Sequence, residues 1–328
     1  MKVNYKRFYE LNGIDYSDTR IVLKSDGDEA KNESYEIPWE TPSEKDNLLE
    51  AKANALIKRF EVNDKTEFLK KFTEAINGDG SELRRITTLH SSALLALMCF
   101  WRVDENHPIS IEQVEYTKVF FECRNRVING RGPSNIDIAL VSKDKKTVLL
   151  LESKFTELYN CKSVTVAESY KPFYDELAKL WGDNIEIKKA PEKGFELTQT
   201  EERSYLGGIK QMVSHIIGAI RGPKKSKTHE EYQRAFENAS EIVLGTILYQ
   251  PSGEEFSGKC ANYAKLYEKC IGGDIGKKIV SAFSRVLNKE KDEVKNIKIL
   301  GKPLYYQDVF TSKNRDLLLE KVKDTYFS

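Results

Sequence analysis

The sequence predicts an α/β protein with a mixed central sheet and helical extensions at both ends. Three observations support this fold class. Short runs of β-branched, aromatic and apolar residues follow one another in the middle of the chain, separated by turn-forming residues. Segments with apolar residues at helical spacing lie on both sides of these runs. Hydrophobic residues make up 40% of the 328 residues, which is enough material for a sizeable core.

The N-terminal part is expected to be mostly helical after an irregular acidic stretch. Acidic residues gather between Asp26 and Glu50. Apolar positions at helical spacing then predict three helices, over residues 44–59, 64–77 and 89–101. Ser43 and Asp64 are expected to cap the first two. The third is so apolar that it should be buried on most sides.

The middle of the chain supplies the strands of the predicted sheet. The expected strands cover residues 114–121, 136–141, 147–151 and 242–249. Turn residues at 129–133 and 143–146 separate the first three strands, and the last two of these should form a hairpin. The helices expected after this hairpin cover about 168–181, 205–220 and 259–288. Residues 297–310 are expected to hold a final strand before a closing helix.

These elements divide the chain into three parts. Residues 1–79 are a mostly helical N-terminal extension, 80–250 an α/β core, and 251–328 a helical C-terminal extension packed on the core. No run approaches the about 18 consecutive apolar residues of a membrane helix. The polar N-terminal sequence also lacks the apolar region of a secretory signal. A cytoplasmic protein is therefore expected.

The cysteines and histidines do not favour a zinc or redox site. The chain has five cysteines, an odd number, and they are widely spaced and never form a C-x-x-C pair. Its four histidines are equally scattered. Any metal should therefore be a hard cation held by carboxylates.

The most informative stretch surrounds Asp137 and the segment Glu152-Ser153-Lys154. Two adjacent strands should bring Asp137 and Glu152 to one end of the sheet, where both carboxylates can share a Mg²⁺ ion. The backbone carbonyl of Ser153 can supply a further oxygen ligand. Lys154 lies two residues after Glu152 and so points to the same face, where it can orient or deprotonate a water molecule. This set predicts a metal-dependent phosphodiesterase.

The E-x-K tripeptide alone carries no weight, because it recurs in this chain at residues 29–31, 50–52, 186–188 and 293–295. The tripeptide at 152–154 differs in its context. It ends an apolar strand, where burying a carboxylate and a lysine is costly, and a second carboxylate stands on the preceding strand. The alternative is a partly buried salt-bridge cluster at the end of the sheet.

The arrangement resembles the PD-(D/E)XK nuclease superfamily, whose members share an αβββαβ core like that of restriction endonucleases. The segments 78–83, 90–94, 121–122, 133–137 and 152–157 resemble, in this order, a bacterial branch of restriction-endonuclease-like proteins. The similarity covers roughly residues 75–250. It implies cleavage of DNA by an endonuclease that needs Mg²⁺, with Mn²⁺ as a substitute, and it implies Asp137, Glu152 and Lys154 as the catalytic set.

The chain departs from the superfamily pattern at two points. Pro133 lies four residues before Asp137 instead of directly before it. The additional acid that such nucleases often use is ambiguous, because Glu82 and Glu122 both qualify. Glu82 can equally be a first-turn helix acid, and Glu122 can equally pair with a nearby arginine.

Other residues are candidates for contacts with the substrate. The helix over 205–220 has one apolar stripe, which leaves Gln211 and His215 on another face. The resemblance implies that Gln211 holds the water or the scissile phosphate. The alternative is that Gln211 is an exposed residue of this helix. His215 is expected to be a partner of Gln211 or a DNA-phosphate contact. Basic residues that could bind DNA phosphates are Arg124, Arg126, Arg131, Lys224 and Lys225.

Two other functions stay open at this point. One is a nucleic-acid-binding module that keeps the fold but does not cut, and the other is a nuclease for RNA or for branched or single-stranded DNA. A nucleotide cofactor is not expected, because the chain has no Walker A sequence and no dinucleotide-binding glycine loop. A homodimer is compatible with cutting both strands. The sequence reveals neither a recognition site nor a role for the acidic segment 26–50.

Overall fold

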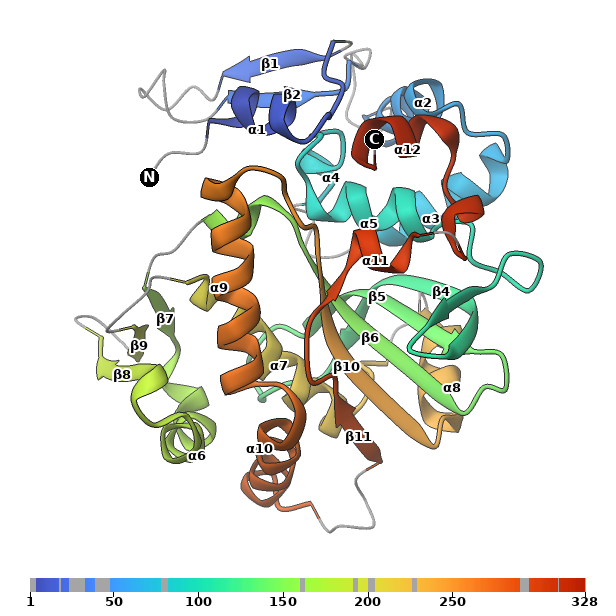
Figure 1. The fold of residues 1–328 in the computed structure, drawn as a ribbon. Coiled ribbons are helices and arrows are strands. Elements are labelled where there is room, and N and C mark those ends of the chain that lie inside the picture. The colour runs from blue at the N-terminus through green and yellow to red at the C-terminus, as the bar shows by residue number, and fades with distance from the viewer. Residues whose placement is uncertain are drawn as a thin grey trace.

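The structure is a computed structural model that describes residues 4–17, 19–23, 33–38, 48–77, 82–159, 163–190, 194–199, 204–225, 229–289, 295–311 and 313–327. Its architecture is α/β, with a curled, mixed central sheet and helices on both faces (Figure 1). The predicted fold class is confirmed at this level. Among the described residues, no helix combines the length and the apolar character that crossing a membrane requires.

The central sheet contains the predicted strands. Its members are β3 (Ile109–Ile111), β4 (Val114–Asn125), β5 (Ser134–Ser142), β6 (Thr147–Lys154), β10 (Glu241–Leu248), β11 (Asn296–Ile299) and β12 (Leu304–Tyr305). The order is β11-β10-β6-β5-β4-β3, and β12 also pairs with β10. The pairs from β3 to β6 are antiparallel, whereas β10 is parallel to β6, β11 and β12. The predicted hairpin of β5 and β6 is confirmed.

The strand period places the side chains of β6 on two different faces. Leu149 and Leu151 belong to one apolar cluster, and Val148 and Leu150 belong to the other. The first cluster contains residues of α1 (Tyr5–Leu11), α2 (Leu48–Phe60), α3 (Lys65–Ala75), α5 (Ser92–Phe100), α11 (Tyr306–Val309) and α12 (Glu320–Tyr326). The second contains residues of α6 (Lys171–Trp181), α7 (Leu206–Arg221), α8 (Glu230–Asn238), α9 (Glu254–Cys270) and α10 (Gly273–Val286). Glu152, Ser153 and Lys154, which follow Leu151 in β6, continue to alternate between the two faces.

The N-terminal part contains the three predicted helices as α2, α3 and α5. Asp64 caps α3, because its Oδ1 accepts the Glu67 N–H at 3.0 Å. Ser43 and most of the acidic segment 26–50 lie outside the described residues. The stretch expected to be irregular contains strand β2 (Glu33–Glu36), which pairs with β1 (Arg20–Leu23), and a short helix, α4 (Glu82–Arg85), precedes α5.

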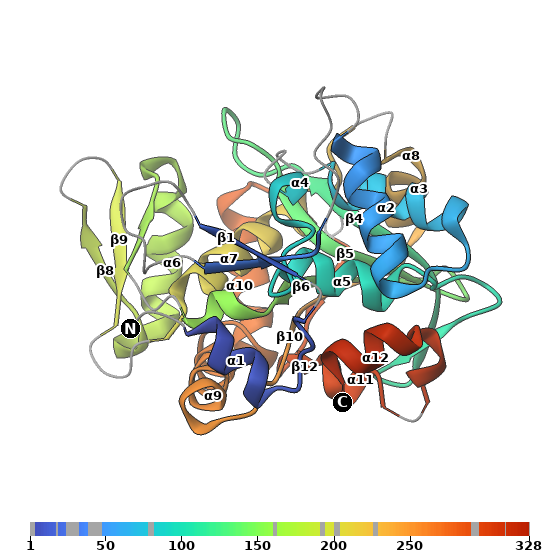
Figure 2. The same ribbon diagram turned by 90° about the horizontal axis from the view of Figure 1, so that it is seen from above.

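Other regions also differ from the prediction. The segment 259–288 forms two helices instead of one, because the chain turns at Gly272 and Gly273. A Cβ on Gly272 would lie 2.3 Å from the Gly301 carbonyl oxygen, and Gly273 has a φ of +57°. A separate small sheet with the order β7-β9-β8 was not predicted. Its strands are β7 (Val164–Val166), β8 (Glu186–Lys189) and β9 (Phe195–Thr198), and it lies beside α6, away from the central sheet (Figure 2).

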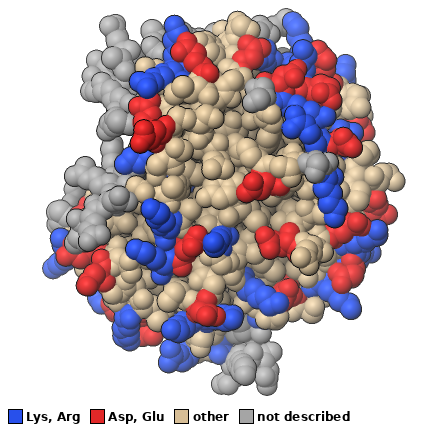
Figure 3. Space-filling view, in the orientation of Figure 1, with Lys and Arg blue, Asp and Glu red and all other residues tan. Residues whose placement is uncertain are grey.

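Charged side chains of both signs mix on the face of the molecule drawn in Figure 3. Figure 3 shows lysine, arginine, aspartate and glutamate side chains interspersed around a central area of other residues. This mixture fits the net charge of +1. The three-part division at 79/80 and 250/251 stays a prediction, and residues from all three parts meet in the first apolar cluster.

Candidate functional site

Three carboxylates lie at one level on three adjacent strands. The pairing of β4 with β5 places Glu122 opposite Asp137. One step beyond the last pair between β5 and β6, the register places Asp137 opposite Glu152. The same level continues to Thr246 of β10, which pairs with Glu152. The end of the central sheet therefore carries a row of acids, as predicted for Asp137 and Glu152.

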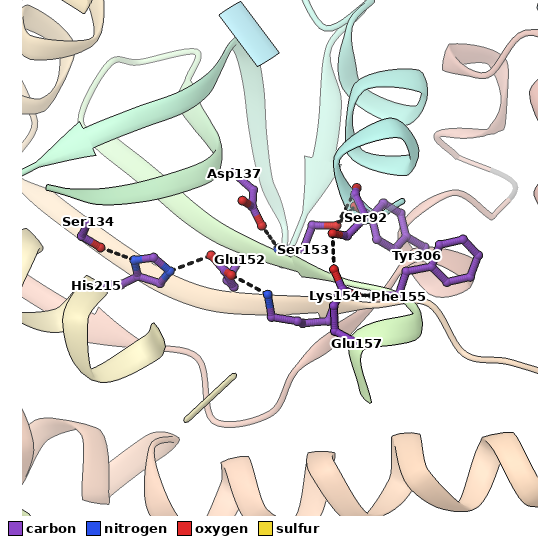
Figure 4. A network of polar contacts seen from close by, with 10 residues as sticks. All are labelled: Ser92, Ser134, Asp137, Glu152, Ser153, Lys154, Phe155, Glu157, His215 and Tyr306. Atoms are coloured by element: carbon purple, nitrogen blue, oxygen red, sulfur yellow. Dashed lines mark hydrogen bonds and ion pairs between the residues drawn. The ribbon is translucent and has the colours of Figure 1, made fainter. Parts of the chain in front are cut away.

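The hydrogen-bond ladder between β5 and β6 stops at this row. The Ser153 N–H donates to Oδ2 of Asp137 at 2.7 Å instead of to a carbonyl of β5 (Figure 4). On the other side of β6, the Lys154 carbonyl accepts the Tyr249 N–H at 3.0 Å. Because the N–H and C=O of one strand residue point to the same neighbour, the Ser153 carbonyl is directed toward the Asp137 side.

Glu152 and Lys154 form a buried ion pair on the face covered by α7. Nζ of Lys154 lies 2.5 Å from Oε1 of Glu152, and the two side chains are 4% and 1% exposed. The prediction that they share a face is confirmed. The tripeptide at 186–188 makes a similar pair at 2.7 Å, but its side chains are about half exposed. Burial therefore distinguishes the two sites.

His215 of α7 joins the same cluster. Its Nε2 lies 2.6 Å from Oε2 of Glu152, and its Nδ1 lies 2.5 Å from Oγ of Ser134. The ring is 4% exposed. In this structure the hydrogen-bond partners of His215 are Ser134 and Glu152, and the expected DNA-phosphate contact stays a prediction. Ser134 was not predicted as a site residue, because no local pattern connects positions 81 residues apart.

The opposite face of β6 is held by a second polar group (Figure 4). Oγ of Ser153 lies 3.2 Å from the Ser92 carbonyl and 2.7 Å from the Tyr306 hydroxyl. Glu157 accepts Oγ–H of Ser92 at 2.5 Å and the Phe155 N–H at 2.8 Å. These contacts hold the backbone between Glu152 and Lys154 in place from the face of β6 opposite to α7.

The surroundings of Asp137 and Glu152 stabilise the charged forms of these two carboxylates to different extents. Burial raises the pKa of Asp137 well above its ordinary value, and the nearby Glu152 and Glu122 raise it further. Lys154 opposes this shift without cancelling it. A proton or another cation is therefore favoured at Asp137.

Glu152 and Lys154 stabilise each other's charges. Burial alone would raise the pKa of Glu152, but Lys154 and His215 outweigh it and lower this pKa to about 2. Burial disfavours the ammonium of Lys154, yet Glu152 and Glu157 raise its pKa well above the usual value. The raised pKa favours the ammonium form of Lys154, which donates a hydrogen bond to Glu152 in this structure.

The two candidates for an additional acid lie in different places. Glu122 belongs to the row, is 6% exposed and has a φ of +47°, which is strained for a non-glycine residue. Glu82 lies on α4, which packs against α5 and is no part of the sheet. The structure therefore brings Glu122 to Asp137 through the strand register. Gln211 is half-buried, one turn before His215 on α7.

The predicted basic residues come together from two segments. The Lys224 N–H donates to the Arg124 carbonyl at 2.8 Å, so the end of β4 lies beside the segment after α7. The guanidinium groups of Arg124 and Arg126 donate to the carbonyls of Asn77 and Arg221. Lys225 and Lys224 are exposed. Arg131, also exposed, donates to Oγ of Ser169 at 3.0 Å.

Three groups at the end of the central sheet could act as ligands of a divalent cation. Asp137, Glu152 and the Ser153 carbonyl supply the oxygen ligands that Mg²⁺ prefers. Burial and, after it, the negative charges of Glu152 and Glu122 raise the pKa of Asp137, and a bound cation would stabilise its ionised form. Each Glu152 oxygen already has one protein partner, Lys154 or His215, with which a cation would compete for the carboxylate charge. Within the described residues, no group of three or more His, Cys, Asp or Glu side chains is arranged to hold a metal.

Comparisons with known proteins identify no relative of this chain. The sequence matches no family model, no similar curated protein was found, and no solved structure matches the fold. The interpretation of the site therefore depends on its own residues.

Proposed function

We propose that the protein is a metal-dependent endonuclease of the PD-(D/E)XK type that cleaves DNA to a 3′-hydroxyl and a 5′-phosphate. The observation that carries this proposal is the row of Glu122, Asp137 and Glu152 beside the buried Lys154. A row of acids at the end of a sheet is suited to holding a cation against a phosphodiester.

A purely structural salt-bridge cluster explains this row less well. One carboxylate is enough to neutralise Lys154, and Glu152 does so at 2.5 Å. Asp137 and Glu122 are not needed for this neutralisation. Burial, together with the charges of Glu152 and Glu122, raises the pKa of Asp137, so the ionised form of Asp137 destabilises the fold. Groups held at such a cost are typical of functional sites.

Each residue has a defined role in the proposed reaction. Asp137, Glu152 and the Ser153 carbonyl would hold the divalent cation, which supplies charge neutralisation at the phosphate and acidifies a bound water. Lys154 donates a hydrogen bond to the attacking water or to the developing charge on the phosphate. Asp137 keeps part of its surface exposed, whereas Glu152 and Lys154 are buried, so the substrate approaches from the Asp137 side.

The order of elements around the site supports the same proposal. A helix (α5), three antiparallel strands (β4, β5, β6), a second helix (α7) and a strand parallel to β6 (β10) follow one another along the chain, with β3, α6, the small sheet and α8 inserted between them. This order agrees with the αβββαβ core that the resemblance implies. DNA as the substrate and a role in restriction or phage defence depend on that resemblance alone.

One observation favours a second candidate, a nucleic-acid-binding module that does not cut. Both oxygens of Glu152 have protein partners, His215 at 2.6 Å and Lys154 at 2.5 Å. A site that stays closed in this way would bind nucleic acid through its basic surface without hydrolysing it.

The test is cleavage of duplex plasmid with Mg²⁺ or Mn²⁺ against an EDTA control. The variants are Asp137→Asn, Glu152→Gln and Lys154→Met, each checked for folding by circular dichroism. Lys188→Met is the matched control, because Lys188 makes the same type of pair with Glu186 on the surface. We expect each site variant to lose activity by at least about 100-fold, as is usual for groups that stabilise a transition state, and the control to keep it.

The same assay separates the alternatives. Single-stranded and branched DNA and RNA are tested in parallel, which distinguishes a nuclease with another substrate. Binding to any of these substrates without metal-dependent cleavage would support the non-cutting module. Equal activity of the wild type and all three site variants would contradict the assignment of the site.

A further inference from the structure

The two partners of Glu152 are held with different rigidity. His215 presents a ring from the middle of α7, and its other nitrogen is fixed by Ser134 at 2.5 Å. Lys154 reaches Oε1 of Glu152 on a flexible four-carbon stem from two residues along the same strand. A divalent cation that binds an oxygen of Glu152 competes for its negative charge with one of these two partners.

We propose that Ser134 and His215 are positioning residues that lock Oε2 of Glu152, and that Lys154 is the exchangeable partner that releases Oε1 when a divalent cation binds. This inference depends on the metal dependence of the proposed function. It adds a role for His215 and Ser134 and an order of events: Lys154 leaves Glu152 as the cation arrives.

Three observations support the assignment of the partners. Moving His215 would break two hydrogen bonds and would leave a buried carboxylate oxygen and the Ser134 hydroxyl without partners. Ser134 is itself only 5% exposed and stands at the start of β5, three residues before Asp137, so it ties the helix to the strand that carries the second ligand. The ammonium group of Lys154, in contrast, has Glu152 as its one hydrogen-bond partner within the described residues, so its release breaks one contact instead of two.

Charge favours the same assignment. An ammonium and a divalent cation repel each other at one carboxylate, so the two compete for Oε1. A histidine that donates from Nε2 orients the carboxylate without adding a competing charge when the ring carries one hydrogen. A released Lys154 remains close to Asp137, with which it already interacts electrostatically, and its ammonium group can donate to the water or the phosphate. Cation binding would thus activate Lys154.

The proposal predicts that Lys154→Met and His215→Asn change the affinity for Mn²⁺ in opposite directions. Lys154→Met removes the competitor and keeps the volume of the side chain, so Mn²⁺ should bind about 10-fold more tightly or better. His215→Asn keeps an atom near Nδ1 but removes the donor to Glu152, so Mn²⁺ should bind about 10- to 100-fold more weakly. His215→Gln can place a donor near Nε2 and should recover part of this loss. Ser134→Ala should weaken binding less than His215→Asn.

The experiment measures Mn²⁺ binding to the full chain without DNA, from the electron paramagnetic resonance signal of free Mn²⁺. Two matched controls replace buried residues of the same types away from Glu152. Lys71→Met removes a lysine that is 5% exposed and donates to the Val119 carbonyl at 2.7 Å. His229→Asn removes an imidazole that is 5% exposed. Both controls should leave the affinity for Mn²⁺ unchanged.

The outcomes separate this inference from the proposed function. A wild type that binds no Mn²⁺ overturns the metal dependence and this inference with it. A wild type that binds Mn²⁺, with Lys154→Met and His215→Asn shifting the affinity in the same direction, overturns the inference alone. If His215→Asn does not fold, His215→Gln and Ser134→Ala decide the role of the pair, and an affinity unchanged in both contradicts it.

Discussion

At the scale of single residues, the carboxyl group of Asp137 is held where its negative charge is unfavourable. Its pKa is raised by burial, by Glu152 and by Glu122. An acid whose pKa is higher in the folded than in the unfolded state destabilises the fold as the pH rises above its unfolded value of about 3.9. The free energy of unfolding therefore contains an unfavourable contribution from Asp137 at neutral pH.

This contribution leads to a prediction for Asp137→Asn. Without divalent metal at pH 7, the variant should be more stable than the wild type toward urea, because the amide carries no charge. The difference should shrink as the pH falls below about 4, where Asp137 is protonated in both states. Urea unfolding in EDTA at pH 3.5 and pH 7 measures it. A variant less stable than the wild type at pH 7 contradicts the charge argument.

Glu152 behaves in the opposite way. Its pKa is lowered to about 2 because Lys154 and His215 outweigh the effect of burial. An acid with a lowered pKa stabilises the fold above its unfolded value of about 4.3, and this stability is lost as the pH falls toward the folded pKa. Low pH should therefore weaken the fold through Glu152.

We predict that Glu152→Gln destabilises the fold at pH 7 by about 3–5 kcal/mol, because it leaves the buried Lys154 without its counter-charge. The difference from the wild type should be largest above about pH 4.3 and shrink below it. Urea unfolding between pH 2.5 and pH 7 checks this. Glu186→Gln is the control, since Glu186 pairs with Lys188 on the surface, and its stability should follow the wild type at every pH.

At the scale of elements, the close packing of α7 on the sheet determines where His215 lies. Gly218 sits one turn after Ser214 and faces the strand ends. A Cβ built on it would lie 2.9 Å from Cβ of Asn125 and 3.4 Å from Cβ of Ser134. The first distance is too short, so α7 or the strands would have to shift.

Gly218→Ala should therefore move α7 and destabilise the protein by about 1–3 kcal/mol, despite the better helix propensity of alanine. Because Ser134 is one of the two contacts, the His215–Glu152 geometry should change and activity should fall with it. The control is Gly258→Ala in α9, an exposed position where a Cβ meets nothing within 4 Å and the better helix propensity of alanine should add stability. Thermal unfolding and plasmid cleavage of both variants make the comparison. Unchanged stability in Gly218→Ala would show that α7 adjusts freely.

The elements also show what the sequence could and could not predict. The β5–β6 hairpin was predictable because a polar turn joins two apolar runs, and its register then places Asp137 opposite Glu152. The break between α9 and α10 was missed because Gly272 matters only through its approach to Gly301, which is distant in sequence. The small sheet was missed because β8 is polar and mostly exposed, with the weak pattern Glu-Ile-Lys-Lys.

The same limit applies to the site. Periodicity within a strand places Glu152 and Lys154 on one face. The contacts of Glu152 with His215 and of His215 with Ser134 join residues 63 and 81 positions apart, so they depend on how α7 packs. The helical stripe of α7 correctly marks its buried face, but the sequence gives no sign that His215 is buried with it.

At the scale of the whole molecule, the near-neutral charge limits how DNA can be attracted. The net charge is +1, and acidic and basic side chains are interspersed on the face seen in Figure 3. Long-range steering by net charge is therefore weak, and affinity for a duplex must come from local groups. The exposed Lys224 and Lys225 are the best placed of the predicted set, because the segment that carries them lies beside the end of β4.

We predict that Lys224→Glu with Lys225→Glu weakens duplex binding and reduces the slope of log affinity against log salt by about 2, roughly one for each phosphate contact. Fluorescence anisotropy in EDTA at several KCl concentrations measures both quantities. The matched control is Lys145→Glu with Lys146→Glu, in the turn of the β5–β6 hairpin at the opposite end of the sheet. Both double variants change the net charge equally. An equal loss of affinity in both double variants would mean that overall charge, and not the surface beside the site, governs DNA binding. A loss confined to the Lys224/Lys225 variant places the duplex next to the carboxylate row.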